Sequence, residues 1–331
     1  MRREADYATL WSLAAFLATA TWCVTVAAPI TALAFHPLER TLVVGHPGAL
    51  GVRRSLELTN ETRIQSGLKR INALGFDPEA KWLAVVGGEP GGAGGIEFHD
   101  WPIGGGAAGE PRRIMATNSD LMMSMAVSPD GRTVAYGGMD RIIRLVRNEV
   151  GVGRFEQHAL LSGHSGPVLA LAFHPGGRWL VSAGVDRTLR VWELASGREV
   201  RSLTHHTDSV TSLVFFGAPG TTSDALGRWY CASGSVDGTI RVWQPEIGRM
   251  IRTIRRGESG VLALAGRPSI VGFWSVGTDG VIRQYGAEDD VVVKERRVSG
   301  DWVYAMTLSP RGGEIATGDW AGTVRVTEME P

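Results

Sequence analysis

Two sets of His, Ser and Asp residues in the middle of the chain are of the types that serine hydrolases use. The sets are His164, Ser182 and Asp186, and His206, Ser233 and Asp237. In such enzymes the Ser oxygen attacks, the His takes its proton, and the Asp orients the His. Here the Ser-to-Asp spacing recurs, and a Trp follows each Asp at the same distance, at Trp192 and Trp243. A buried Asp needs hydrogen-bond donors, which His and a hydroxyl supply, so the repetition predicts a structural role and no catalytic residue.

The segments that carry these residues are units of a longer repeat. The first strand of a unit is recognisable seven times, starting at Ile30, Ile71, Met123, Val168, Val210, Val261 and Val303. Each unit holds short apolar runs separated by Gly, Pro, Asp or Ser, which predicts strands joined by tight turns. The spacing of the units is close to the period of about 40–45 residues of a four-stranded propeller blade.

On these residues the chain resembles the WD-repeat family, over residues 22–331. The resemblance implies an all-β, seven-bladed β-propeller of four-stranded antiparallel blades, with the ring closed by an N-terminal strand. It also implies that each complete unit has a hydrogen-bonded tetrad. The tetrad residues are His164, Ser182, Asp186 and Trp192 in the fourth unit, and His206, Ser233, Asp237 and Trp243 in the fifth.

The other units depart from the tetrad pattern. The third unit keeps Asp140 but has Tyr136 and Val146; the second has Glu89 and His99; the sixth has Gly257 in the His position, with Ser275, Asp279 and Tyr285; the seventh has Ala321 and Thr327. We therefore expect these blades to depend on apolar packing.

Further residues that could bind a ligand lack the necessary context. The Gly-rich stretch from Gly104 is not flanked by a strand and a helix, so it predicts a flexible loop between the second and third blades rather than a nucleotide site. The pair His205–His206 has no other ligand at metal spacing, and Cys23 and Cys231 fit buried apolar positions. An Arg recurs in the third strands and is interpreted as an outward-facing edge charge. No cofactor and no metal are expected.

The charge balance limits the classes of partner. Lys plus Arg and Asp plus Glu both number 34, so the formal net charge is +0. A neutral chain lacks the basic surface that nucleic-acid binding requires, so no nucleic-acid partner is expected.

The N-terminal region has two interpretations. Residues 1–21 form an apolar extension, and residues 22–28 have the composition of the fourth strand that the seventh unit lacks before the chain ends. Alternatively, the apolar run is a signal peptide or membrane anchor, although Glu4 and Asp6 interrupt its basic start. A membrane contact is then expected only through residues 8–28. We expect a cytoplasmic location, with the membrane-anchored or secreted location as the alternative.

The resemblance implies a non-enzymatic scaffold that binds a protein or peptide on the loop face around the central channel. The alternative is a membrane-anchored or exported propeller in an envelope complex. An enzyme is a weaker hypothesis, because the first strands contribute Ala, Leu and Met, which provide no acid, base or metal ligand.

Large apolar residues occur where the family's loops reach that face. The loop before a first strand and the residue before the turn Asp supply the partner-binding candidates Trp302, Trp320, Leu121, Met139, Arg70 and Glu258. Trp and Arg are frequent binding hot spots. In a second interpretation, Trp302 and Trp320 pack on each other in place of the tetrad that the seventh blade lacks.

Overall fold

We analysed a computed structural model of the chain. It describes residues 28–54, 61–102, 113–117, 120–149, 154–217, 229–267, 269–288, 290–310 and 313–328. The predicted strand at residues 22–28 lies almost entirely outside these ranges, as do Cys23 and the N-terminal extension. Within them, no helix is long and apolar enough to cross a membrane.

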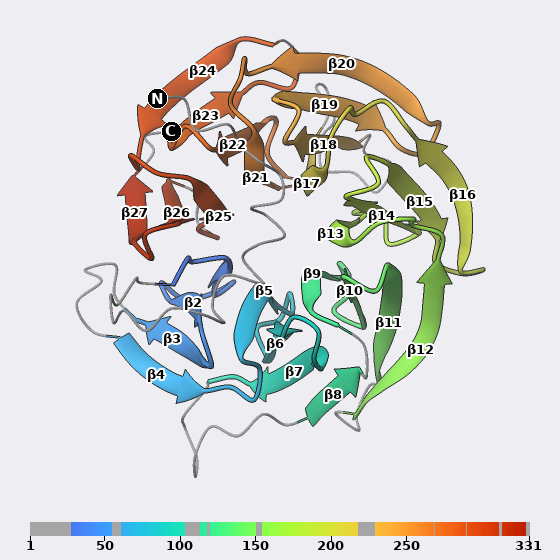
Figure 1. Ribbon diagram of the computed structural model, residues 1–331, viewed down its shortest axis with the longest axis vertical. Coiled ribbons are helices and arrows are strands. Elements are labelled where there is room, and N and C mark those ends of the chain that lie inside the picture. The colour runs from blue at the N-terminus through green and yellow to red at the C-terminus, as the bar shows by residue number, and fades with distance from the viewer. Residues whose placement is uncertain are drawn as a thin grey trace.

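The described strands form seven antiparallel sheets arranged as blades around a centre (Figure 1). Blade 1 contains β1 (Leu33–Phe35), β2 (Leu42–His46), β3 (Ala49–Arg53) and β4 (Glu61–Gln65). Blade 2 contains β5 (Arg70–Phe76), β6 (Trp82–Gly88), β7 (Gly94–Asp100) and β8 (Arg113–Thr117). Blade 3 contains β9 (Met122–Val127), β10 (Thr133–Gly138), β11 (Ile142–Glu149) and β12 (Arg154–Ser162). Blade 4 contains β13 (Val168–Phe173), β14 (Trp179–Gly184), β15 (Leu189–Glu193) and β16 (Arg198–Leu203).

Blade 5 contains β17 (Val210–Gly217), β18 (Trp229–Ser235), β19 (Thr239–Gln244) and β20 (Arg249–Arg255). Blade 6 contains β21 (Val261–Gly266), β22 (Phe273–Gly277), β23 (Val281–Tyr285) and β24 (Val292–Arg297). Blade 7 contains β25 (Val303–Leu308), β26 (Glu314–Asp319) and β27 (Val324–Glu328), and its described sheet has three strands. The all-β, seven-bladed architecture predicted from the sequence is therefore confirmed.

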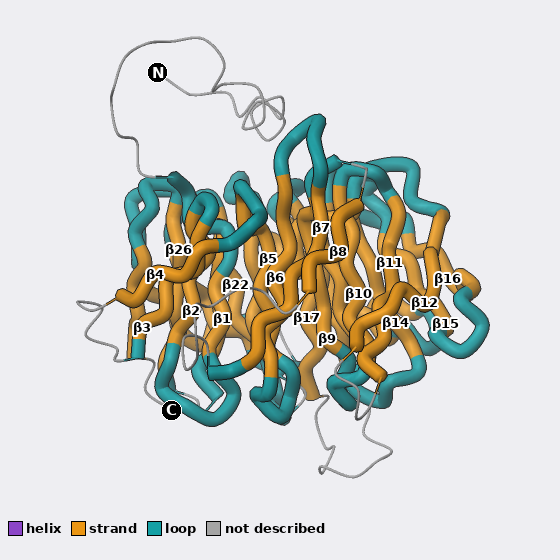
Figure 2. Tube along the Cα trace, turned by 90° about the horizontal axis from the view of Figure 1, so that it is seen from below, coloured by secondary structure: helices purple, strands orange, loops and turns teal. Residues whose placement is uncertain are grey.

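Within each blade the first strand lies nearest the centre, and the fourth strand, where described, lies at the rim (Figure 1). Loops that lead into the first strands and turns between second and third strands meet on one face, which we call the entry face. The β6–β7 hairpin rises above this face (Figure 2). The opposite face, which we call the exit face, carries the turns that follow the first and third strands.

Burial explains the strand sequences. The middle strand β14 is almost wholly buried, whereas the outer strand β16 is mostly exposed. A strand covered on both faces by neighbouring blades can be apolar along its whole length, and a rim strand cannot.

An apolar cluster fills every gap between neighbouring blades, including the gap between the last blade and the first. In that closing gap, Leu33 and Phe35 of blade 1 pack with Ala305 and Ala316 of blade 7. Ile30 N also donates a hydrogen bond to the Asp319 carbonyl at 3.1 Å. Packing between blades 1 and 7 thus joins the two ends of the described ring.

Two interpretations from the sequence are wrong. The Gly-rich stretch from Gly104 lies outside the described residues, but it does not join blades 2 and 3, because the strands on either side of it, β7 and β8, pair with each other in blade 2. The third-strand arginines of blades 3–6 are not edge charges, because described fourth strands cover the third strands of these blades, whereas Arg325 of blade 7 lies on the outermost strand of its described sheet. Instead these arginines contact groups of their own blades; for example, Arg144 Nη2 lies 2.5 Å from Asp140 and Arg325 Nη1 lies 2.9 Å from Asp319.

Candidate functional site

The His, Ser, Asp and Trp residues singled out in blade 4 form one hydrogen-bonded network. His164 Nδ1 lies 2.8 Å from Asp186 Oδ2, and His164 Nε2 lies 2.7 Å from Ser182 Oγ. Trp192 Nε1 donates to the same Ser182 oxygen at 2.8 Å. In blade 5 the equivalent residues are His206, Ser233, Asp237 and Trp243, and the matching distances are 2.9, 2.8 and 2.8 Å.

These hydrogen bonds fit a neutral His. Its Nδ1–H donates to the carboxylate, and its Nε2 accepts the hydroxyl hydrogen of Ser182, whose oxygen accepts from Trp192. Ser182 and Ser233 are each 0% exposed, so a substrate has no access to either hydroxyl. The arrangement is a structural tie between the loop before the first strand, the turn and the middle strands.

The charges in both networks are held by local donors. Burial alone would raise the pKa of Asp186, but hydrogen bonds from His164 and Thr188 hold it well below its usual range. The pKa of Asp237 is lowered in the same way, against burial, by His206 and Thr239. Burial lowers the pKa of His206 despite the neighbouring carboxylate, which favours the neutral ring.

Blade 2 builds a different network around a carboxylate that the sequence analysis missed. Glu97 of β7 is 0% exposed. It accepts hydrogen bonds from Ser66 Oγ at 2.8 Å and Gly67 N at 2.7 Å, and His99 Nε2 lies 3.2 Å away. The predicted Glu89 instead forms an exposed ion pair with Lys69. The sequence indicates this buried carboxylate by a Glu within the apolar strand sequence I-E-F-H.

Blade 7 also contains a buried carboxylate, two positions before the expected one. Asp319 is 3% exposed and accepts a hydrogen bond from Ser299 Oγ at 2.8 Å, while Arg325 lies 2.9 Å away. Ser299 occupies the position that His holds in blades 4 and 5. Blades 2 and 7 therefore combine the expected apolar packing with a buried polar network that the sequence analysis did not predict.

Blade 6 replaces the His by Arg256, whose side chain is 1% exposed. Arg256 Nη2 lies 3.0 Å from Asp279 Oδ1, and Arg283 pairs with the same carboxylate. Ser275 keeps its fully buried position, but its hydroxyl has no hydrogen-bond partner within the described part of the chain. The reason is that Tyr285 replaces the Trp whose indole N–H would donate to the hydroxyl, and Gly257 replaces the His whose ring nitrogen would accept the hydroxyl hydrogen.

The first strands form the inner ring, and most contain a β-bulge near their start. The bulged residues are Asn72, Met123, Leu169, Thr211, Leu262 and Tyr304. Where this side chain is polar and short it links blades: Asn72 Nδ2 donates to Met122 O at 2.8 Å, and Thr211 Oγ1 donates to Val261 O at 2.7 Å. The Tyr304 hydroxyl is buried and has no such partner among the described residues.

Tyr304 lies between the two tryptophans singled out from the sequence. Its ring centroid is 6.2 Å from that of Trp302 and 5.9 Å from that of Trp320. Trp320 N donates to Trp302 O at 2.8 Å, which joins the loop and the turn that carry them. Both indoles are half-buried. We call Trp302, Tyr304 and Trp320 the aromatic cluster; Tyr304 was not identified from the sequence.

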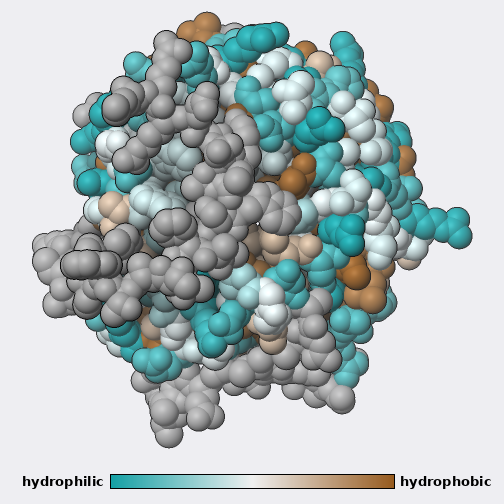
Figure 3. Space-filling view, in the orientation of Figure 1, coloured by the Kyte–Doolittle hydropathy of each residue, from teal (hydrophilic) through white to brown (hydrophobic). Residues whose placement is uncertain are grey.

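The other partner-binding candidates are distributed around the entry face. Met139 and Arg70 are half-buried and Glu258 is exposed, whereas Leu121 is 7% exposed and packs inside its blade. On the face drawn in Figure 3, hydrophilic and apolar side chains are interspersed over the described residues.

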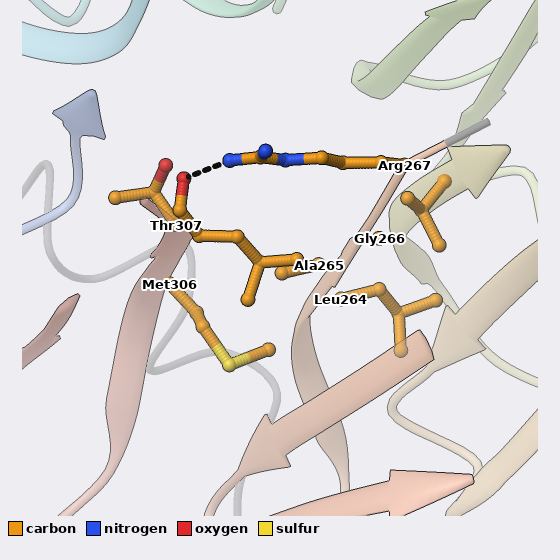
Figure 4. A pocket seen from close by; sticks show the side chains of 8 residues that line it. Leu264, Ala265, Gly266, Arg267, Met306 and Thr307 are labelled. Carbon is orange, nitrogen blue, oxygen red and sulfur yellow. Dashed lines mark hydrogen bonds between the residues drawn. The ribbon is translucent and has the colours of Figure 1, made fainter. Parts of the chain in front are cut away.

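A cavity of about 280 Å³ lies at the exit-face ends of β17, β21 and β25. Leu264 and Met306 contribute apolar side chains to it, and Arg267 donates to Leu308 O at 2.9 Å (Figure 4). Arg267 is the one ionisable residue in the lining, and it is engaged with main-chain oxygens. The described residues contain no group of three or more His, Cys, Asp or Glu that could hold a metal, and Cys231 is fully buried.

Sequence comparison identifies the repeat type. The family model for the WD domain, G-beta repeat, matches residues 109–146, 155–193 and 197–244. No curated protein matches the chain. The three matched repeats and the seven blades of the structure together support a WD-repeat propeller family for this chain. Propellers of this family are commonly protein-interaction scaffolds and typically lack enzymatic activity.

Proposed function

We propose that this chain is a non-enzymatic scaffold that binds a protein or peptide on its entry face, around the central channel. The observation that carries the proposal is the aromatic cluster of blade 7. Two half-buried indoles and a Tyr with an unpartnered hydroxyl meet at the start of an innermost strand. Aromatic side chains in such positions contribute a large share of binding energy at protein interfaces.

The backbone around the cluster is held in place before any partner arrives. Ser299 and Asp319 join the loop before β25 to the end of β26, and Ser299 Oγ also accepts a hydrogen bond from Asp301 N at 3.1 Å. Trp302 N in turn donates to Asp301 Oδ1 at 2.8 Å. Side chains on a fixed backbone lose little conformational entropy on binding, which favours affinity.

The test compares Trp302→Ala and Trp320→Ala with Ile247→Ala. Ile247 is 62% exposed and follows the third strand of blade 5, so it lies on the exit face and serves as the matched control. Melting temperature and recovery of binding partners by affinity purification are measured for all three variants.

We expect both Trp variants to lose the partners that the wild type and the control recover, with melting temperatures close to wild type. A large fall in melting temperature with the same partners recovered contradicts the proposal and supports a purely structural role for the indoles.

A further inference from the structure

We propose that the aromatic cluster binds a cationic side chain, the ammonium of Lys or the guanidinium of Arg, presented by a peptide segment of the partner. This inference rests on the proposed function, because it names the chemistry of the group that the entry face receives. It is argued from the arrangement of the rings and from the charges around them.

The ring arrangement suits a compact cation. The planes of Trp302 and Tyr304 are inclined by 54°, and those of Tyr304 and Trp320 by 44°, at centroid separations near 6 Å. Rings inclined in this way do not stack face to face on one another. A cation within about 6 Å of an aromatic face is attracted by the negative potential of that face, most strongly for Trp.

The cluster also lies in a negative electrostatic environment. Asp301 directly precedes Trp302 and is half-buried. Burial raises the pKa of the Tyr304 hydroxyl, and the charge of Asp301 raises it further, which indicates that this carboxylate acts on the cluster. An anionic partner group would therefore be repelled here, and a cationic one attracted.

Two neighbouring blades add carboxylates to the same face. Asp208 precedes the first strand of blade 5 in the position that Asp301 holds in blade 7, and its Oδ1 likewise accepts from the next amide, Ser209 N, at 2.6 Å. Glu258 lies in the corresponding loop of blade 6 and is exposed. The loops entering β17, β21 and β25 thus form an acidic arc that ends at the aromatic cluster.

Most of the basic residues near the arc are engaged with other groups: Arg255, at the end of β20, is exposed, but Arg297 Nη1 at the end of β24 donates to Asp279 O at 3.0 Å. Arg256 is buried against Asp279, and Arg283 pairs with the same carboxylate. Arg325 pairs with Asp319. Lys69, which directly precedes β5, and Arg70, its first residue, belong to blade 2, which blade 1 separates from blade 7 (Figure 1). The charge distribution favours a partner whose cationic group lies over blade 7.

The experiment uses the full chain and displayed peptide libraries with randomised flanks. The central residue is Lys, its uncharged analogue norleucine, or Glu. Binding is measured for the wild type and for Trp302→Ala, Asp301→Asn and Glu79→Gln. The amide of Asp301→Asn can still accept the Trp302 N–H, so this variant removes charge and keeps the turn. Glu79 is an exposed acid in the β5–β6 turn on the exit face and provides the matched control.

We expect the Lys library to be enriched over the norleucine and Glu libraries. Trp302→Ala should lower the affinity of enriched Lys peptides about 2- to 30-fold, and Asp301→Asn about 2- to 5-fold, while Glu79→Gln leaves it unchanged. Enrichment of norleucine or Glu peptides that still depends on Trp302 overturns the cationic assignment and leaves the proposed function standing. If no library gives binding that depends on Trp302, both are overturned.

Discussion

The Ser position of the tetrad offers a sharp test of the buried networks. The Ser hydroxyl has hydrogen-bond partners in blade 5, at Ser233, and none among the described residues in blade 6, at Ser275. Ser233→Ala removes the oxygen that accepts from Trp243 Nε1 at 2.8 Å and lies 2.8 Å from His206 Nε2. Both ring nitrogens are then left in a buried environment. Each such group costs about 1–3 kcal/mol, so for the two groups we expect a loss of about 2–6 kcal/mol in the free energy of unfolding.

Ser275→Ala in blade 6 is the internal control. Ser275 is equally buried, yet its hydroxyl has no partner among the described residues, so its removal strands no other group. We expect a change within about 0.5 kcal/mol or a slight gain in stability. The comparison with Ser233→Ala therefore separates the network from the loss of a buried oxygen as such.

Urea denaturation followed by tryptophan fluorescence and by far-ultraviolet circular dichroism measures the effect. A shift of the midpoint at constant slope reports a change in stability rather than a change in the unfolded state. Ser182→Ala in blade 4 should match Ser233→Ala. Equal losses at Ser182, Ser233 and Ser275 would refute the argument, because the hydrogen bonds would then not be the source of the stability.

Three further predictions concern pH, a turn and the buried Glu. Because the pKa values of Asp186 and Asp237 are lowered in the folded state, the unfolded state takes up protons first, so stability should fall as the pH drops below about 4, by up to about 1.4 kcal/mol per pH unit for each carboxyl. Replacing both by Asn should flatten this acid limb in pH-dependent urea titrations. Arg187 has φ of 65° in a turn where blade 5 has Gly238, so Arg187→Gly should stabilise the chain by about 0.5–1 kcal/mol in urea titration, and an unchanged midpoint would argue against strain there. Glu97→Gln should cost about 1–3 kcal/mol, because an amide nitrogen would face donors that now point at a carboxylate; an unchanged melting curve would contradict this.

The fold was predictable because each blade repeats a short-range pattern. The start of the first strand recurs seven times in the sequence, and the sheets of the structure follow that count. The boundaries inside blade 2 were not predictable, since a long Gly-rich segment separates β7 from β8 and gives no indication of which blade it belongs to. The side-chain direction of the third-strand arginines also depends on the fourth strand, which sequence spacing alone does not fix.

The networks were predictable only where spacing is regular. In blades 4 and 5 the Asp stands a fixed distance after Ser, and the four side chains meet as expected from the resemblance. In blade 7 the carboxylate has moved to Asp319, and in blade 2 it has moved to Glu97 on another strand. A sequence pattern with fixed spacing cannot find a carboxylate that forms hydrogen bonds of the same kind from a different position. Tyr304 was missed for a related reason, since only the bulge and the ring distances show its relation to Trp302.

The displaced carboxylate of blade 7 connects the scaffold to the proposed site. In blades 4 and 5 a His reaches from the entry loop to the turn; in blade 7 the shorter Ser299 requires an acid nearer the strand, and Asp319 supplies it. Ser299 Oγ then accepts from Asp301 N, and Trp320 N donates to Trp302 O, so both indoles are carried on backbone held by the network. The hydrogen bond between Ser299 and Asp319, which replaces the tetrad, therefore keeps the loop fixed while bulky aromatic side chains occupy the entry face. A preorganised binding surface requires this combination.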